Sequence, residues 1–225
     1  MKAHEFWQEI HSAETVTPQP YEKSYPARLP DGRILFLPIR PLGESGSAIA
    51  SLILNQAALA VEDALAGWLA ERLAPFSPDI VVGLPTLGLS LARLVAAKLG
   101  HRRYIALGTS RKFWYDDELS VPVESITSPG ARKRLYVDPR MLPLLENARI
   151  ALVDDVISTG TSISAGLDLL GASGHEPVVI GAAMLQTRRW ADRLESDRRG
   201  MAGRVRGVIE TPLLERAEGG WRPLD

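Results

Sequence analysis

The stretch of residues 149–162, which reads RIALVDDVISTGTS, constrains the fold more than any other part of the sequence. It begins with an apolar run at residues 150–153, which is typical of a strand buried on both faces of a parallel sheet. Two adjacent carboxylates, Asp154 and Asp155, follow at the place where we expect this strand to end. After Ser162 the apolar residues recur at helical spacing to about residue 173. The stretch therefore predicts a strand, a loop and a helix.

The predicted loop combines hydroxyl groups with a glycine. In open α/β sheets, ligands bind beyond the carboxyl ends of the strands. A helix that begins at Thr161 or Ser162 would direct unpaired N–H groups toward that place. Gly160 would let the backbone approach a ligand closely. We therefore expect a phosphate site, and the residues expected to form it are Ser158, Thr159, Gly160, Thr161 and Ser162.

The two carboxylates indicate a second group on the same ligand. Asp154 and Asp155 would repel a phosphate, because like charges repel. They can instead accept hydrogen bonds from sugar hydroxyls or bind a divalent cation. A site that binds both a phosphate and a diol predicts a sugar phosphate as its ligand.

The whole stretch closely resembles the motif with which type I phosphoribosyltransferases bind 5-phosphoribosyl 1-pyrophosphate (PRPP). That motif is an apolar strand, two acidic residues, a short apolar link and Thr-Gly-x-Thr or a near variant. The resemblance implies that Asp154 and Asp155 face the ribose hydroxyls and that residues 158–162 hold the 5′-phosphate. It implies a Mg²⁺-dependent pentosyltransferase that joins a nitrogenous base to C1 of PRPP and releases pyrophosphate. The family holds the metal largely through PRPP oxygens and waters, so ligation by Asp154 or Asp155 can be indirect.

Composition and charge are those of an ordinary globular protein. The 225 residues suffice for one sizeable core with a small subdomain. The net charge of −1 gives no basic field, so we expect no nucleic acid as the main partner. Cysteine is absent, which excludes disulfides and thiolate metal sites. No apolar run approaches the ~20 residues that span a bilayer, so we expect no membrane association and a cytoplasmic location.

Strand patterns alternate with helical patterns along most of the chain, which predicts an α/β fold. We expect a mostly parallel twisted sheet with helices on both faces, the Rossmann-like fold that the resemblance to type I phosphoribosyltransferases also implies. The other core strands are expected at residues 79–82, 104–107, 177–185 and 205–209. Helices are expected at residues 48–73 and 89–99, with a short one through Trp190 and Leu194.

The N-terminal segment is rich in proline and predicts a small subdomain. A short helix is expected around residues 4–12, and two strands, 21–27 and 33–38, flank a turn. We therefore divide the chain into a hood, residues 1–45, and a core, residues 46–225. Family members use such a hood to recognise the base. The polar tail, residues 215–225, is expected either to fray or to pack through Trp221.

Two further loops resemble the pyrophosphate-binding parts of the family. The first follows the strand at residues 79–82, and we expect Pro85, Thr86, Leu87 and Gly88 to bind pyrophosphate there. Many relatives have a cis peptide bond in this loop that does not precede proline, and the Thr86 peptide is our candidate for it. The second loop follows residues 104–107 and carries Arg111 and Lys112, a cation pair suited to a pyrophosphate.

Residues 108–138 form a long excursion before the central motif. We expect strands at residues 121–126 and 135–137, which would make a hairpin, and family members close such an excursion over the substrates. The basic tip would then place a catalytic cation, Lys133 or Arg132, on the departing pyrophosphate. The alternative is a solvated loop tip.

The identity of the base depends on one departure from a subfamily pattern. Ser158 stands where hypoxanthine–guanine enzymes have a carboxylate, so the motif looks more like the adenine or orotate enzymes. The cation pair favours purine salvage of the adenine type, with a pyrimidine such as orotate as the alternative. A PRPP-binding regulator without catalysis is a further alternative, against which the near-neutral charge argues. Family members are commonly dimers, so we expect a homodimer.

Overall fold

The computed structural model describes residues 1–15, 17–123 and 133–224. Its core is a parallel sheet with the strand order β10-β9-β8-β4-β5. The strands of this sheet, in chain order, are β4 (Ile80–Gly83), β5 (Ile105–Ala106), β8 (Ile150–Ile157), β9 (Pro177–Gln186) and β10 (Val205–Thr211). The parallel α/β fold expected from the sequence is thus confirmed.

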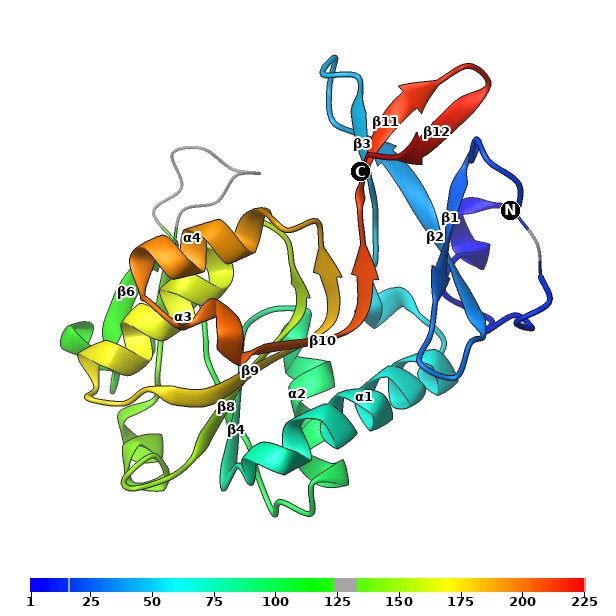
Figure 1. Cartoon of the computed structure of the whole chain (residues 1–225). Helices are drawn as coiled ribbons and strands as arrows, with labels where there is room; N and C mark the ends of the chain where they lie inside the picture. Colours follow the sequence, from blue (N-terminus) through cyan, green and yellow to red (C-terminus); the bar gives the residue numbers. More distant parts are fainter. Residues whose placement is uncertain (16, 124–132, 225) are drawn as a thin grey trace.

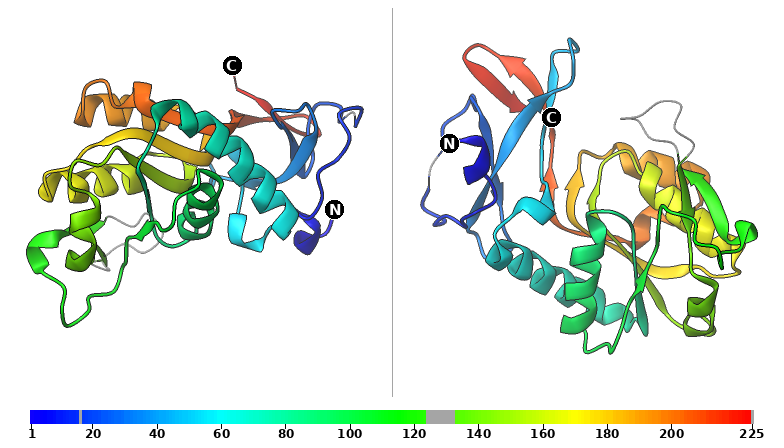
Figure 2. Two further views of the ribbon diagram at one scale, coloured as in Figure 1. Left: turned by 90° about the horizontal axis from the view of Figure 1, so that it is seen from below. Right: turned by 180° about the vertical axis from the view of Figure 1, so that it is seen from behind.

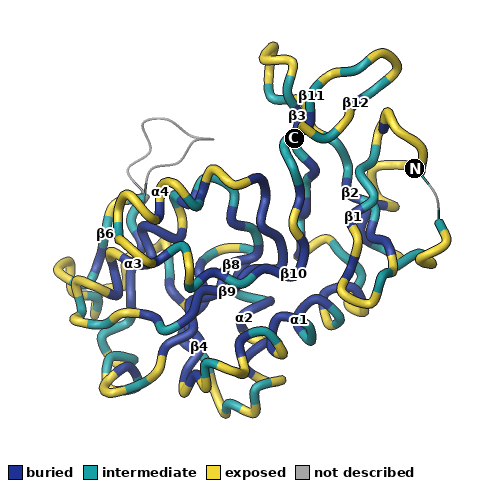
Figure 3. The backbone as a smooth tube through the Cα atoms, in the orientation of Figure 1, coloured by how far each residue is buried: buried dark blue, intermediate teal, exposed yellow. Residues whose placement is uncertain are grey.

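Two pairs of helices cover the two faces of this sheet (Figure 1). Helices α1 (Leu59–Leu73) and α2 (Gly88–Lys98) pack on one face, and α3 (Thr161–Ala172) and α4 (Arg189–Asp197) lie on the other. The buried side chains of β8 alternate between these layers, with Ala151 and Val153 facing α1 and α2, and Ile150 and Leu152 facing α3. Burial on both faces explains why residues 150–153 are uniformly apolar. Figure 3 shows β8, β9 and the other strands of the parallel sheet as the most deeply buried part of the molecule.

The order of the strands reverses between β4 and β8. After β4 the chain passes through α2 to β5, whereas after β8 it passes through α3 to β9, on the other side of the sheet. The loops that follow β4 and β8 therefore diverge to opposite faces. Such a switch point opens a crevice at the carboxyl ends of the strands, where α/β proteins bind their ligands.

A second, antiparallel sheet forms the hood, with the strand order β1-β2-β3-β11-β12. Its strands are β1 (Ser24–Arg28), β2 (Ile34–Pro41), β3 (Ser47–Ala50), β11 (Leu213–Ala217) and β12 (Gly220–Pro223). The two ends of the chain both lie in this hood (Figures 1 and 2). This sheet thus takes β1 and β2 from the segment expected as the hood, residues 1–45, and β3, β11 and β12 from outside that segment.

The tail is held in the hood by Trp221. This side chain is buried against Leu214 and Ala48. Its backbone exchanges two hydrogen bonds with Tyr21, at 2.7 and 2.9 Å. The tail therefore packs through Trp221, which is one of the two alternatives expected from the sequence.

Two expected helices are wrong. Residues 48–73 do not form one helix, because β3 and a 3-10 turn (Leu54–Gln56) precede α1. Strand β3 pairs with β2 and β11, and these tertiary contacts override the helical preference of its alanines. Near the N-terminus, a single 3-10 turn (Ala3–Glu5) replaces the helix expected around residues 4–12. In the described ranges, no helix has the length and apolar character needed to cross a bilayer.

The excursion forms a short hairpin against α3. Its arms are β6 (Ser120–Val123) and β7 (Lys133–Tyr136), which pair antiparallel as expected. Residues 124–132, including Arg132, lie outside the described residues. Lys133 is described through its backbone, as the first residue of β7.

Candidate active site

Strand β8 continues through the two carboxylates instead of ending before them. Its pairing with β4 ends at Val153, but its pairing with β9 continues to Ile157. The sequence-based end of the strand at Asp154 is therefore wrong, because β9 is long enough to pair with β8 beyond that point. Asp154 is the first residue of β8 past its partner β4, and this places it at the switch point.

The two carboxylates are buried and poorly compensated. Asp154 is 5% exposed and Asp155 is 9% exposed. The backbone N–H of Asp155 donates to Oδ1 of Asp154 over 2.9 Å. Burial raises the pKa of Asp154 well above its usual range, and repulsion from Asp155 adds to this. Burial also raises the pKa of Asp155. A ligand that donates hydrogen bonds, or a cation, would relieve both costs.

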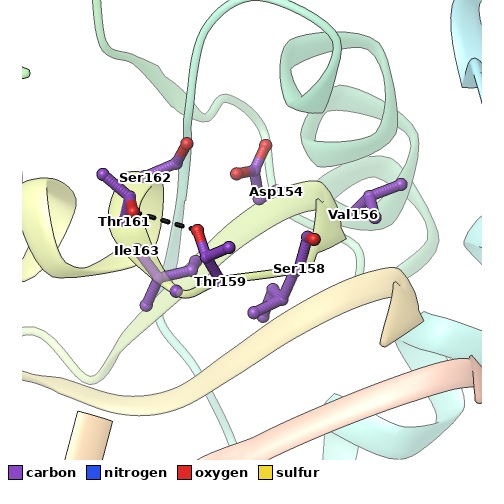
Figure 4. A pocket seen from close by; sticks show the side chains of 9 residues that line it. Asp154, Val156, Ser158, Thr159, Thr161, Ser162 and Ile163 are labelled. Carbon is purple, nitrogen blue, oxygen red and sulfur yellow. Dashed lines mark hydrogen bonds between the residues drawn. The ribbon is translucent and has the colours of Figure 1, made fainter. Parts of the chain in front are cut away.

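The loop after β8 and the first turn of α3 form a pocket of about 70 Å³. A cavity measured in this way needs only roughly 10–15 Å³ to hold one water, so the pocket has room for a larger group such as a phosphate. All five residues expected to hold a phosphate line it together with Asp154 (Figure 4); the full lining is Asp154, Val156, Ile157, Ser158, Thr159, Gly160, Thr161, Ser162 and Ile163. The structure thus brings the acidic residue and the hydroxyl-rich loop together.

The start of α3 leaves backbone donors available to a ligand. Gly160 precedes the helix with φ 81°, and no side chain caps the helix. The first intrahelical hydrogen bond joins the N–H of Ser164 to the carbonyl of Gly160 (2.8 Å), so the N–H groups of residues 161–163 have no partner within the helix. The hydroxyls of Thr159 and Thr161 hydrogen-bond each other at 2.9 Å. These N–H groups and the helix dipole suit an anion.

Helix α4 packs directly on this loop. A Cβ atom at Gly160 would lie 3.4 Å from the carbonyl oxygen of Trp190. One turn further along α4, Nη1 of Arg193 donates a hydrogen bond to Oγ1 of Thr161 over 3.2 Å. Sequence reasoning missed Arg193, although the expected helix through Trp190 and Leu194 already carried it. The sequence did not reveal that α4 lies beside the loop after β8, because this depends on the pairing of β9, which precedes α4, with β8.

The loop after β4 lies next to the acidic pair. Gly88 begins α2, and a Cβ atom placed on it would come 2.7 Å from Oδ1 of Asp154. The peptide bond between Pro85 and Thr86 is cis, as the sequence predicts. Thr86 is exposed, whereas Pro85 and Leu87 are half-buried. These four residues do not line the pocket of residues 154–163, so any pyrophosphate they bind would lie beside it.

The expected cations are not gathered at the pocket. Nε and Nη2 of Arg111 donate to the carboxylate of Asp117 over 2.8 and 3.3 Å, in an exposed ion pair. Lys112 is exposed. The described lining of the pocket includes neither residue. The catalytic roles expected for Arg132 and Lys133 stay predictions, because Arg132 and the Lys133 side chain lie outside the described residues.

The carboxylates fit a magnesium ion held mainly by a substrate. Among the described residues, no group of three or more His, Asp or Glu side chains could hold a metal by itself. Mg²⁺ is commonly bound by one or two carboxylates plus substrate phosphates and waters. Asp154 lines the phosphate-sized pocket, and Asp155, which follows it in β8 but does not line the pocket, supplies a second buried carboxylate nearby.

Comparison with known proteins relates most of the chain to one family. The model of the phosphoribosyl transferase domain matches residues 51–215. The chain is 31% identical to the bifunctional protein PyrR 2 of Lactiplantibacillus plantarum over 48% of its length. It is 29% identical to the transcriptional regulator GfcR of Archaeoglobus fulgidus over 52% of its length. It is also 29% identical to the adenine phosphoribosyltransferase of Rhodospirillum rubrum over 53% of its length.

These matches cover only part of each relative. They span 58% of PyrR 2, 51% of GfcR and 64% of the Rhodospirillum rubrum protein. Among solved structures, the chain resembles the adenine phosphoribosyltransferase of Giardia lamblia in complex with 9-deazaadenine. The TM-score is 0.60 and the identity is 20%, over 77% of this chain and 93% of that one. At that identity the likeness supports the fold.

Proposed function

Because the chain belongs to the phosphoribosyltransferase family, we propose that it transfers the 5-phosphoribosyl group of PRPP to a nitrogenous base and releases pyrophosphate. The fold is that of the type I phosphoribosyltransferases. The observation that carries the proposal is the placement of buried Asp154 against a pocket of hydroxyls and free helix N–H groups. A sugar monophosphate carries both a phosphate, which suits the N–H groups, and hydroxyl donors, which suit the carboxylate.

The roles of the residues follow from their chemistry. The N–H groups at the start of α3 would hold the 5′-phosphate, since they have no partner within the helix. Asp154 and Asp155 would accept hydrogen bonds from the ribose hydroxyls. Their charge would also favour the cationic character that the sugar develops as its bond to pyrophosphate breaks. This is differential binding, because the positive charge is largest in the transition state.

Magnesium is part of the proposal. Asp154 and Asp155 would hold it, directly or through waters, and bound magnesium would neutralise charge on the departing pyrophosphate. Arg111 and Lys112 would add positive charge on the same side. To reach the pyrophosphate, the guanidinium of Arg111 must leave its ion pair with Asp117. Breaking this pair costs little free energy, because the pair is exposed to solvent. Residues 85–88 would contact the pyrophosphate next to Asp154.

We propose a purine acceptor of the adenine type. Ser158, which lines the pocket, stands at the loop position where hypoxanthine–guanine enzymes have a carboxylate that acts on the base nitrogen. The match to a protein named adenine phosphoribosyltransferase supports this choice. Orotate is the alternative acceptor.

A regulator that binds PRPP without catalysis is the second candidate function. The match to a protein named transcriptional regulator supports it. The net charge of −1 argues against broad contact with nucleic acid. A nucleic-acid binding assay at several salt concentrations would detect such a regulator, because phosphate contacts make affinity fall steeply with salt.

One experiment tests the catalytic proposal and the choice of base. The protein is incubated with PRPP, Mg²⁺ and, separately, adenine, hypoxanthine, guanine or orotate, and pyrophosphate release is measured. We expect release with adenine and little with the other bases. Release with orotate alone would correct the acceptor, and PRPP binding without release for any base would favour the regulator. The homodimer and the cytoplasmic location stay predictions. Light scattering would measure the oligomeric state.

A further inference from the structure

The phosphate pocket lacks a positive side chain of its own. None of its lining residues is Lys, Arg or His, and one of them is the acid Asp154. A phosphate monoester carries about −1.5 to −2 charges at pH 7. The start of α3 offers about half a positive charge. The described lining therefore compensates only part of the charge of the ligand proposed for it.

Arg193 is the cation that reaches this lining. Its helix packs on the phosphate loop through the buried residue Trp190, and Leu194 is buried in the core cluster that includes Ile163 of α3. This packing places Arg193 beside the first turn of α3, where Nη1 donates to Oγ1 of Thr161 over 3.2 Å. Thr161 lines the pocket, so the guanidinium lies one hydrogen bond away from a pocket atom.

Two neighbours position the guanidinium. Nε of Arg193 lies 3.6 Å from Oδ2 of Asp197, one turn along α4. The same Oδ2 atom accepts a hydrogen bond of 3.0 Å from the hydroxyl of Ser164 on α3. A separation of 3.6 Å is too long for a hydrogen bond, so Asp197 orients the guanidinium without binding it tightly. A guanidinium has five N–H donors, more than Thr161 and Asp197 engage here.

We propose that Arg193 is a binding residue for the 5′-phosphate of the substrate and makes the site selective for a doubly charged monoester. Its guanidinium would contact the phosphate beside Thr161, with Asp197 and Ser164 as positioning residues. The inference rests on the proposed function, because it assumes that a sugar phosphate occupies the pocket. It adds a residue that lies outside the strand–loop–helix motif and 32 residues from Thr161.

The test measures the dissociation constant of ribose 5-phosphate by calorimetry. The variants are Arg193→Gln, which removes the charge, and Arg193→Lys, which keeps it. Arg198→Gln is the matched control, since Arg198 lies just past α4 and pairs with Asp168 at 2.8 Å. Asp168 is seven residues beyond Thr161, about 10 Å along α3. We expect at least tenfold weaker binding for Arg193→Gln, partial recovery for Arg193→Lys and wild-type binding for Arg198→Gln.

The pH dependence separates a contact with the phosphate from a structural role. The second pKa of a phosphate monoester is about 6, so ribose 5-phosphate gains a charge between pH 5 and 7.5. Binding to the wild-type protein should tighten more over this range than binding to Arg193→Gln. The inference would be overturned if Arg193→Gln bound ribose 5-phosphate with wild-type affinity. It would also be overturned if Arg193→Gln lost affinity by the same factor at pH 5 and at pH 7.5 and Arg193→Lys did not recover it. A wild-type protein that binds neither ribose 5-phosphate nor PRPP would instead contradict the proposed function itself.

Discussion

Gly88 of α2 lies directly against Asp154 of β8. A methyl group on Gly88 would come 2.7 Å from Oδ1 of Asp154 and 2.8 Å from its Cα atom. Real Cβ atoms do not approach neighbours this closely, so the contact exists only because residue 88 has no side chain. The start of α2 and strand β8 therefore fix each other's positions, and the predicted pyrophosphate loop, which leads into α2, is coupled to Asp154.

The first prediction is that Gly88→Ala pushes α2 away from Asp154. The obstructing Cα atom belongs to a central strand and cannot move aside easily. Overpacking of this kind costs roughly 1–3 kcal/mol, and urea unfolding would measure it. We also expect a higher KM for PRPP in steady-state kinetics, because residues 85–88 shift with the helix. Gly203→Ala is the control, since a Cβ there meets no atom within 4 Å; equal effects of both changes would contradict the coupling.

The second prediction concerns Asp154→Asn. Asparagine keeps an oxygen that can accept the N–H of Asp155, so the fold should persist. Turnover should fall on the order of 10²-fold or more, because a charge that stabilises the transition state is lost. The double change with Asp155→Asn should be at least as severe. Wild-type rates in the double variant would show that the ribose contact is assigned wrongly.

The third prediction is that Asp154→Asn stabilises the ligand-free protein at neutral pH. Burial is the main cause that raises the pKa of Asp154, and repulsion from Asp155 adds to it. Ionising this group therefore costs free energy in the folded state. Each unit of raised pKa corresponds to about 1.4 kcal/mol. One kcal/mol shifts Tm by about 2–4 °C in a chain of this size. Differential scanning calorimetry would detect this rise, and a lower Tm would contradict it.

The fourth prediction is the pH dependence of stability. A raised carboxyl pKa means that the folded state binds more protons than the unfolded state between about pH 3.9 and the raised value. The free energy of unfolding contributed by this pair therefore falls as pH rises through that window. Urea unfolding of wild type and Asp154→Asn at several pH values isolates the effect of the pair, since the titration of remote groups cancels in the difference. A difference independent of pH would contradict it.

How much the sequence predicts depends on how local each feature is. Residues 150–162 carry their strand, loop and helix signals within one short stretch, so the strand–loop–helix that contains the proposed phosphate site could be read directly. The continuation of β8 through Asp154 could not, because it depends on the length of β9. Strand β3 could not be predicted either, because it also depends on distant partners. Ala48 and Ala50 favour a helix, and only the pairing with β2 and β11 makes the segment a strand.

The strands of the hood and the position of Arg193 could not be predicted either, because both depend on contacts between residues far apart in the sequence. Strands β11 and β12 carry few buried residues, so their pattern is too weak to predict strands. Trp221 fixes them through Ala48 and Tyr21, two partners from the N-terminal half of the chain. Arg193 approaches Thr161 because α4 packs on Gly160, where a side chain would meet Trp190. No spacing in the sequence signals a contact of this kind.

The central claim is that Asp154 and Asp155 bind the ribose of PRPP while the start of α3 binds its 5′-phosphate. Titration of PRPP with Mg²⁺ into the wild-type protein and the double variant Asp154→Asn, Asp155→Asn by isothermal calorimetry tests it most directly. We predict saturable binding to the wild-type protein and at least tenfold weaker binding to the variant. No heat with the wild-type protein, or equal affinity in both proteins, would contradict the claim.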